Sequence, residues 1–183
     1  PPPPPPPPLF FFKHNQANAI SSCIVGTDMC KSFTIICILY RPMKTYLNYK
    51  GLTVLAHRGG ADESPENTLE SFEYSIALGC DFIETDVQVS LDGIPYIFHD
   101  DDLKRIANIP KKFDSLKSEE IDEIKIFGNH EIPRLEDVLN KFPYTSFQID
   151  FKTDEVVIPA LDVIKKTNSF DRVCIASFNS KRL

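Results

Sequence analysis

The chain has 183 residues, of which 42% are hydrophobic and 25% are charged, so it is long and apolar enough to form one globular domain with a sizeable core. Its formal net charge of -6 argues against a nucleic-acid partner, because phosphate backbones are bound by basic faces. An anionic substrate must therefore meet locally placed cations or a metal ion.

The N-terminal residues 1–16 read as a proline-rich disordered tail. Pro1–Pro8 form an uninterrupted proline run, which predicts a polyproline II rod of about 25 Å at about 3.1 Å per residue. A spacer is the favoured interpretation, and a ligand for a proline-binding module is the alternative. Because the first residue is Pro rather than Met, we expect the sequence to begin inside a longer or processed chain.

Residues 17–50 form an apolar, Cys-containing segment without a clear role. Asp28 and Lys31 interrupt it, and two charges near a bilayer centre cost roughly 5 to 7 kcal/mol, more than the roughly 2 to 4 kcal/mol that the apolar residues return. A membrane span or a signal peptide is therefore disfavoured. Membrane contact is not favoured either, and the cytoplasm is the expected compartment, with membrane association or secretion as the alternatives.

The cysteines give no framework for a metal or for disulfides. Cys23, Cys30 and Cys37 are spaced by seven residues, which is not zinc spacing, and with Cys80 and Cys174 the total is an odd five. Reduced thiols in an intracellular protein are the expectation.

From residue 51 onward, strand and helix signals alternate. Strands are expected at 52–56, 81–89, 146–151 and 173–177, and helices at 68–78, 135–142 and 156–166. Asn67 or Thr68 is the expected N-cap of the first helix, which ends before Gly79. Such alternation predicts an α/β fold with a parallel sheet. Asp92-Gly93 instead predicts a tight turn, so that residues 94–98 return as a hairpin on 87–90.

Strand alternation predicts which side chains gather at the site. If Ile83 and Val87 pack under helices, Glu84 and Asp86 point to the opposite face. The third strand gives the same result, with Asp150 and Lys152 opposite its apolar positions. Carboxylates that converge repel one another unless a cation lies between them, so this pattern predicts a hard divalent metal ion.

Two histidines and an arginine complete the expected chemistry. His57 ends the first strand and His99 ends the segment after the turn, and two side chains with near-neutral pKa values can divide the acid and base roles that phosphodiester cleavage needs. Arg58 can grip phosphate oxygens bidentately, and Lys152 can add a point charge. A lone strand-end His or a Glu-x-Asp pair is more often structural, so the prediction rests on their joint placement.

Several spaced motifs resemble the glycerophosphodiester phosphodiesterase family. They are HRGG at 57–60, PENT at 65–68, ESFEYSIALGCDFIETDV at 70–87, DG at 92–93, HDDDLKR at 99–105, IPRLEDVL at 132–139, IDFK at 149–152 and VCIASFN at 173–179. The resemblance covers roughly residues 52–180, so that 51–183 is interpreted as a partial domain of this family. It implies a TIM (β/α)8-type barrel that releases an alcohol and glycerol 3-phosphate from a glycerophosphodiester, or acts on a lysophospholipid, as part of lipid metabolism.

The resemblance also implies roles for individual residues. His57 and His99 would be the catalytic pair, Arg58 and Lys152 would bind phosphate, and the divalent metal, Ca²⁺ or Mg²⁺, would be held by a carboxylate set of Glu84, Asp86 and Asp150. Asp150 stands where the family commonly has Glu, and the IANIPKK segment at 106–112 replaces a Thr-rich, Gly-containing turn.

The length of the chain is the main argument against hydrolase activity. A full barrel takes eight strands and about 250 residues, whereas only about the first four β/α units are expected here. We therefore expect an incomplete sequence, or one completed by the missing barrel half or a second copy. The alternatives to an active hydrolase are an inactive fragment or binding remnant of such an enzyme, and a phosphatidylinositol phospholipase C-like phosphodiesterase, which would release a cyclic phosphate.

Overall fold

The main sheet contains four parallel strands in the order β1-β2-β6-β7. The computed structural model describes residues 54–80 and 82–183, so the predictions made for residues 1–50 lie outside the described part. The strands are β1 (Leu55–His57), β2 (Phe82–Val89), β6 (Ser146–Phe151) and β7 (Val173–Ala176). The predicted strands are thus confirmed: β6 has the predicted bounds, and the ends of the other three differ from the prediction by at most three residues.

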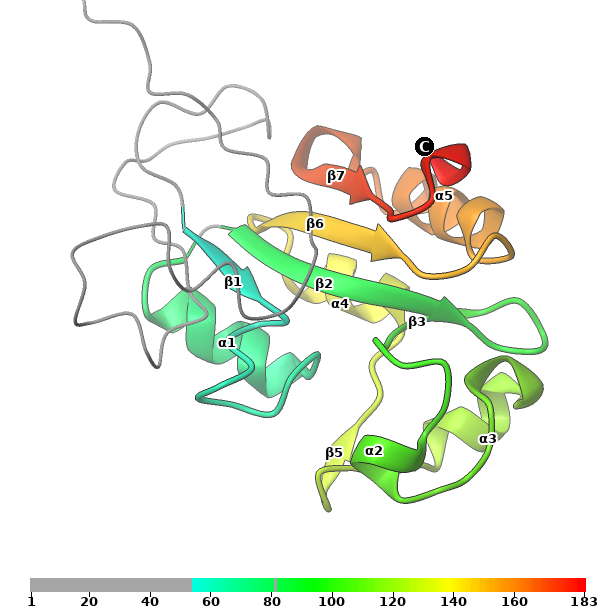
Figure 1. The fold of residues 1–183 in the computed structure, drawn as a ribbon. Coiled ribbons are helices and arrows are strands. Elements are labelled where there is room, and N and C mark those ends of the chain that lie inside the picture. The colour runs from blue at the N-terminus through cyan, green and yellow to red at the C-terminus, as the bar shows by residue number, and fades with distance from the viewer. Residues whose placement is uncertain (1–53, 81) are drawn as a thin grey trace, which may run out of the picture.

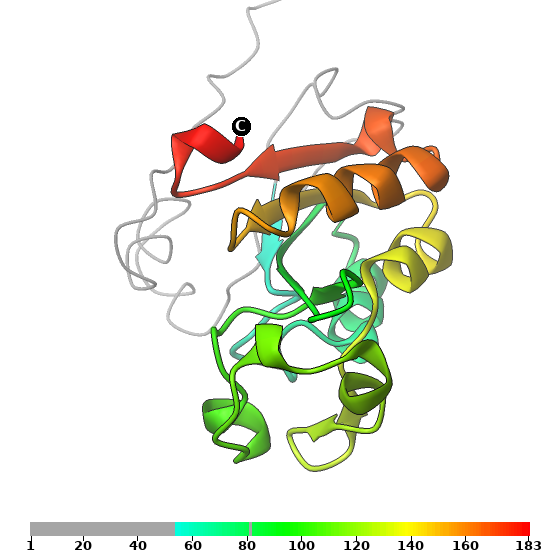
Figure 2. The same cartoon turned by 90° about the vertical axis from the view of Figure 1, so that its right-hand side faces the viewer.

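Three helices cover one face of this sheet (Figures 1 and 2). They are α1 (Leu69–Ala77), α4 (Leu135–Lys141) and α5 (Val157–Lys166), each within a range predicted from periodicity. Thr68 is the N-cap of α1: its hydroxyl accepts a hydrogen bond from the Ser71 amide, while the Ser71 hydroxyl accepts one from the Thr68 amide. Each of α1, α4 and α5 therefore returns the chain to the next parallel strand of the main sheet.

The chain makes an excursion between β2 and α4, below the sheet in Figures 1 and 2. Ser90 and Ile94 close the predicted turn at Asp92-Gly93, and β3 (Pro95–Ile97) then pairs antiparallel with β2. The excursion continues through α2 (Lys104–Ala107), a 3-10 turn (Phe113–Ser115), α3 (Ser118–Asp122) and the short pair β4 (Lys125–Ile126) and β5 (His130–Glu131). The Asp92-Gly93 dipeptide predicted the hairpin, but the elements from α2 to β5 were not predicted, because each of them is only a few residues long.

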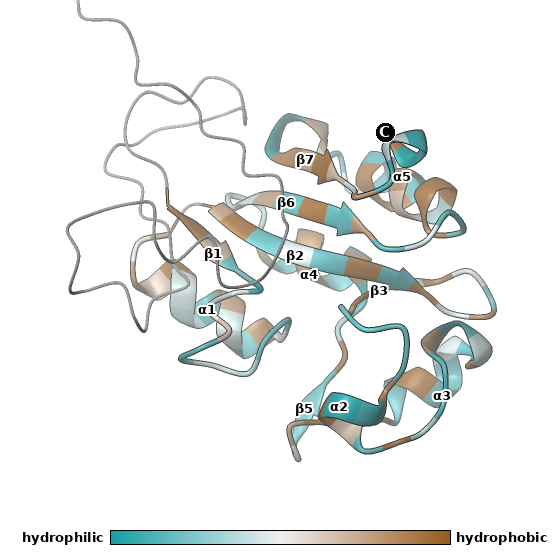
Figure 3. Cartoon of the chain, viewed as in Figure 1, coloured by the Kyte–Doolittle hydropathy of each residue, from teal (hydrophilic) through white to brown (hydrophobic). Residues whose placement is uncertain are grey.

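Alternation along the strands separates an apolar face from a polar face. The bands of hydropathy alternate along β2 and β6 (Figure 3). Ile83 and Val87 of β2 and Phe147 and Ile149 of β6 belong to the core that α1, α4 and α5 cover. The polar residues between them therefore face away from the helices, as predicted from the two-residue period.

The excursion has a hydrophobic core of its own. Its buried members include the stacked rings of Phe98 and Phe113, whose centroids are 4.6 Å apart, and Tyr96, which meets Phe113 edge to face. The Tyr96 hydroxyl donates a hydrogen bond to Asp122 in α3. The excursion is thus stabilised by its own apolar core, and it lies at one end of the sheet.

The remaining expectations concern membrane-spanning helices and the cysteines. Within the described ranges, no helix has the length and apolar character that a membrane crossing requires. Cys80 and Cys174 form no disulfide within the described part of the chain, whereas Cys23, Cys30 and Cys37 lie outside it.

Candidate active site

The polar side chains of neighbouring strands lie in register on the face away from the helices. His57 of β1 is the register partner of Glu84 in β2, and Asp86, two residues further on, is the partner of Asp150 in β6. Since paired residues of parallel strands project to the same side, these four side chains form two adjacent rows. The His57 Nε2 atom lies 3.9 Å from Glu84 Oε2.

The turn after β1 places Arg58 over these rows. Arg58 adopts a left-handed backbone conformation with φ of 50°, and Gly59 follows with φ of 73°. A Cβ atom at Gly59 would lie 2.4 Å from the Ser71 hydroxyl and 2.6 Å from the Phe72 ring, so only glycine fits between this turn and α1. The Arg58 amide consequently points at the sheet and donates a hydrogen bond of 3.1 Å to Glu84.

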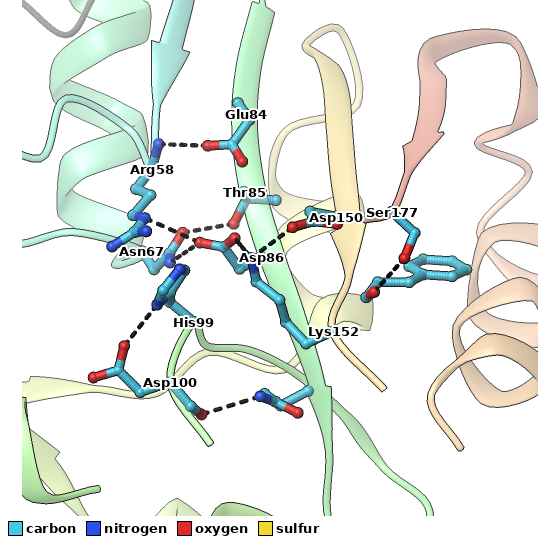
Figure 4. Close-up of polar contacts among 12 residues, drawn as sticks. Arg58, Asn67, Glu84, Thr85, Asp86, His99, Asp100, Asp150, Lys152 and Ser177 are labelled. Carbon is cyan, nitrogen blue, oxygen red and sulfur yellow. Dashed lines mark hydrogen bonds and ion pairs between the residues drawn. The ribbon is translucent and has the colours of Figure 1, made fainter. Parts of the chain in front are cut away.

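Asp86 is the centre of the cluster shown in Figure 4. One carboxylate oxygen lies 3.2 Å from Arg58 Nε and accepts a hydrogen bond from Asn67, and the other lies 2.7 Å from Lys152 Nζ. Asn67 is itself fixed by the Thr85 hydroxyl. Burial alone would raise the pKa of Asp86, but the charges of Lys152 and Arg58 outweigh it and lower that pKa. Asp86 is therefore an ionised, almost fully buried anchor for two cations.

Nearby cations and hydrogen-bond donors do not fully satisfy the carboxylates of Glu84 and Asp150. Burial, followed by repulsion from Asp86, raises the pKa of Glu84 well above its usual range. Asp150 accepts a hydrogen bond of 2.5 Å from Lys152 through Oδ2, while its buried Oδ1 has no hydrogen-bond partner among the described residues. An unpaired buried carboxylate oxygen is costly unless a further cation or donor satisfies it.

The carboxylate oxygens of this site are suitable ligands for a hard divalent cation. Oxygen ligands are what Ca²⁺ and Mg²⁺ require, and Glu84, Asp86 and Asp150 offer them from two adjacent strands, with one oxygen of Asp150 unused. In the arrangement described for residues 54–80 and 82–183, however, no three His, Cys, Asp or Glu side chains surround a common point suitable for a metal. Lys152 lies between Asp86 and Asp150 instead.

His99 approaches the same cluster from the excursion. Phe98 donates a backbone hydrogen bond to the Asp86 carbonyl, which fixes the chain next to β2 just before His99. The His99 ring lies close to Asp86 in Figure 4, and its charge would contribute to lowering the Asp86 pKa. Its Nδ1 atom is 2.6 Å from the Asp100 carboxylate. His99 therefore belongs to the group that contains Asp86, Arg58 and Lys152.

The structure places the residues predicted from the sequence at one end of the sheet, but their roles in binding and catalysis remain predictions. Four members of the network were not predicted as site residues: Glu66, Asn67, Asp100 and Arg105. Glu66 and Asn67 lie in the PENT motif, which strand and helix signals explain equally well as a turn and a cap. Asp100 and Arg105 lie in the HDDDLKR motif that begins with His99, and this motif was the signal that could have pointed to them. His130 pairs with Glu70 at 3.3 Å, and Glu70 is not a member of this network.

Parallel strands that carry polar side chains on one face, with helices on the other, are the arrangement of a β/α-barrel type of protein. The family model described as "Glycerophosphoryl diester phosphodiesterase family" matches residues 57–182. The chain belongs to this family, as its motifs indicated, and its fold is of the TIM-barrel type.

Individual relatives agree with this assignment. A "Probable glycerophosphodiester phosphodiesterase 2" of Mycobacterium tuberculosis is 32% identical over 142 residues, which cover 77% of this chain and 54% of the relative. Lysophospholipase D GDPD3 of Mus musculus is 32% identical over 136 residues, which cover 66% of this chain and 40% of the relative.

Solved structures give the same result. The glycerophosphodiester phosphodiesterase from Agrobacterium tumefaciens is 26% identical with a TM-score of 0.66, and the match covers 70% of this chain and 58% of that structure. A phosphodiesterase from Oleispira antarctica, solved with its product sn-glycerol-3-phosphate, is 27% identical with a TM-score of 0.63, covering 69% and 57%. The chain thus spans about half the length of the relatives that it matches.

Proposed function

We propose that this chain carries the catalytic half of a phosphodiesterase that hydrolyses glycerophosphodiesters to an alcohol and glycerol 3-phosphate. The observation that supports this most strongly is the pairing of Arg58 and Lys152 with the buried Asp86, in a cluster that also contains His99, while His57 lies beside Glu84 on the neighbouring strand. In a chain with a net charge of -6, this arrangement concentrates two fixed cations where an anionic phosphate can bind.

Each side chain has a defined task in this proposal. Arg58 and Lys152 bind the non-bridging phosphate oxygens and stabilise the charge that grows there as water attacks phosphorus. One of the two histidines, His57 or His99, accepts the proton of the attacking water. The other donates a proton to the alkoxide that leaves as the phosphorus–oxygen bond breaks. The products are therefore a free alcohol and a phosphate monoester.

Glu84, Asp86 and Asp150 are proposed to hold a divalent cation, Ca²⁺ or Mg²⁺. Two features support this: the buried Oδ1 of Asp150, which has no hydrogen-bond partner among the described residues, and the position of Glu84, where burial and then repulsion from Asp86 raise its pKa, so that a cation would favour its ionised form. When bound, such an ion neutralises negative charge on the phosphate and polarises its oxygens. Because Lys152 contacts two of the three carboxylates, its ammonium would share or yield this position.

The proposed substrates follow the printed names of the relatives. These names include glycerophosphodiester phosphodiesterases and a lysophospholipase D, so glycerophosphocholine and lysophosphatidylcholine represent the two substrate classes to test. A role in lipid metabolism and a cytoplasmic location are part of the proposal.

The test is hydrolysis of glycerophosphocholine by the purified chain with added Mg²⁺ or Ca²⁺, measured as glycerol 3-phosphate released. We expect product from the unaltered chain, loss of product after chelation, and a rate lower by about 100- to 10,000-fold in His57→Ala. His130→Ala is the matched control, since His130 pairs with Glu70 outside the site, and it should leave the rate unchanged.

Each failure has its own interpretation. No product from the unaltered chain would indicate an inactive fragment or a binding remnant. A cyclic phosphate product from an inositol phospholipid would instead favour the phosphatidylinositol phospholipase C-like alternative. Full activity in His57→Ala would contradict the proposed role of His57 as acid or base, and activity that survives chelation would contradict the proposed metal.

A further inference from the structure

The carboxylate of Asp100 contacts the imidazole of His99 on the side of the ring that lies away from Asp86 (Figure 4). Its Oδ1 atom lies 2.6 Å from His99 Nδ1, a distance at which the two atoms share a proton in a hydrogen bond. The side chain of Asp100 is 19% exposed and that of His99 is 32% exposed, so the contact is largely screened from water. The pair therefore differs from the freely solvated ion pairs at the surface of the chain.

Arg105 holds this carboxylate in place. Its Nε atom donates to Asp100 Oδ2 at 2.6 Å, and its Nη2 atom donates to Asp100 Oδ1 at 3.0 Å. A two-pronged contact of this kind fixes the plane of the carboxylate as well as its position. Burial alone would raise the pKa of Asp100, but the hydrogen bonds from Arg105 and His99 lower it, so the group is ionised and can only accept hydrogen bonds.

Glu66 links this arrangement to the phosphate-binding side of the site. It accepts two hydrogen bonds from Arg105, at 2.5 and 3.2 Å, and one from Arg58 Nη1 at 3.1 Å. Arg58 in turn contacts Asp86. The result is a chain of alternating charges that runs from Asp86 through Arg58, Glu66, Arg105 and Asp100 to His99. Arg105 is thus fixed at both ends of its guanidinium, although its side chain is 46% exposed.

The proton on His99 follows from this geometry. An ionised carboxylate has no hydrogen to donate, so the hydrogen in the contact with Asp100 is carried by Nδ1 of His99. A neutral imidazole with hydrogen on Nδ1 has its lone pair on Nε2. Nε2 is then the atom that can accept or deliver a proton, and rotation of the ring would break the contact at Nδ1.

We propose that Asp100, held by Arg105 and Glu66, is a positioning residue that fixes His99 in the Nδ1–H tautomer and presents Nε2 to the substrate. This inference deepens the proposed function, on which its catalytic meaning rests, but the tautomer itself can be observed without any turnover. Asp100 would act through His99 and would not contact the reacting atoms.

The direct experiment is nitrogen-15 NMR of the histidine side chains in the full chain, raised in pH until the His99 ring is neutral. The chain has only four histidines, and His99→Gln identifies the signal of interest by its disappearance. We expect the Nδ1–H pattern for His99 in the unaltered chain and a shift toward the Nε2–H pattern in Asp100→Ala. Arg105→Gln should give a mixture, because the carboxylate loses its two-pronged support.

Asp101→Asn is the matched control. Asp101 is the next residue, and its side chain accepts a long hydrogen bond of 3.4 Å from Gln88 rather than contacting His99, so its variant should keep the unaltered His99 pattern. An Nε2–H pattern in the unaltered chain would overturn the proposal at once, whether or not any variant folds. An unchanged His99 signal in a folded Asp100→Ala variant would overturn it as well.

Kinetics separate this inference from the proposed function. With glycerophosphocholine, Asp100→Ala should lower kcat by about 10- to 100-fold, a part of what a positioned acid or base contributes, with KM changed less than about 2-fold. Asp100→Glu should recover part of the loss. If the unaltered chain hydrolysed nothing yet showed the Nδ1–H tautomer, the proposed function would fail while the positioning of His99 by Asp100 would stand. Undiminished kcat in Asp100→Ala would contradict the positioning role.

Discussion

The parallel sheet and the excursion between β2 and α4 contribute to the same site from two separate cores. The sheet packs against α1, α4 and α5 through a large apolar cluster, whereas the excursion closes around Tyr96, Phe98 and Phe113. The sheet supplies His57, and the excursion supplies His99. The site is therefore assembled where two independently packed regions meet, and its geometry depends on both of them.

The two regions differ in how firmly their side chains are fixed. Asp86 and Asp150 project from paired strands, so register and alternation fix their direction. His99, Asp100 and Arg105 follow a short hairpin and depend on ion pairs with one another and with Glu66. Regular secondary structure thus positions the first set, whereas a polar network positions the second.

The largest effect is expected from a cavity in the sheet core. Phe147 is fully buried and meets Phe72 of α1 edge to face, with ring centroids 5.9 Å apart. Phe147→Ala should lower the free energy of unfolding by about 3 to 5 kcal/mol, measured by urea unfolding followed by circular dichroism. The nearby Tyr144 is 95% exposed, so Tyr144→Ala should change it by less than about 0.5 kcal/mol. Equal effects of the two substitutions would contradict this assignment of the core.

A cavity in the excursion should act locally. Phe113 is buried and stacks on Phe98, so Phe113→Ala should weaken the excursion by about 3 kcal/mol while the sheet keeps most of its protection. Hydrogen exchange should speed up in peptides from residues 94–134 and stay slow in β6 and α5. Phe127→Ala is the control, because Phe127 is 42% exposed in the same excursion. Equal acceleration in both regions would show that they form one cooperative core.

A smaller and pH-dependent effect is expected at the turn that begins the excursion. Asp92 accepts hydrogen bonds from the amide and hydroxyl of Ser118 at the start of α3, and these bonds lower its pKa from 3.8 to about 2. Asp92→Ala should lower the free energy of unfolding by about 1 kcal/mol, as for the loss of a helix cap.

The sign of the pH dependence follows from the lowered pKa. The contribution of Asp92 is fully present above its ordinary pKa of 3.8 and is lost as the pH falls toward about 2. The difference between the unaltered chain and Asp92→Ala should therefore shrink over that range in urea unfolding at several pH values. A difference that grew on acidification would refute this role of Asp92.

The smallest effect is expected from a surface ion pair within the sheet region. Lys166 Nζ lies 2.7 Å from Glu136, joining α5 to α4, but the Lys166 side chain is 67% exposed. Lys166→Ala should cost less than about 0.5 kcal/mol at low salt and less still at high salt. Lys125→Ala, which removes the exposed pair with Glu131 in the excursion, should match it. A loss above about 1 kcal/mol in either would mean that such pairs hold the regions together.

The sequence predicts the sheet region well because its elements have clear periods. The alternation of Ile83 and Val87 with Glu84 and Asp86 determined which side chains face the helices, and the structure confirms it. The motifs around His57 and His99 predicted the family, which the comparisons confirm.

The excursion could not be predicted in the same way. α2 and α3 have four and five residues, too few to show a helical period, and they are held by Phe98, Phe113 and Tyr96 from elsewhere in the chain. The ion pair between Arg105 and Glu66 joins residues 39 positions apart, so no local pattern reveals it. Long-range polar networks of this kind become visible only once the fold brings their members together.

The central claim is that His57 of the sheet and His99 of the excursion act together in one reaction. The most direct measurement is a double-mutant cycle of kcat/KM for glycerophosphocholine with His57→Ala, His99→Ala and both. Each single substitution should lower kcat/KM by at least about 100-fold, and the double variant should be little worse than the poorer single one, because acid and base serve the same step. Losses that simply multiply, or a single variant with full activity, would contradict the account.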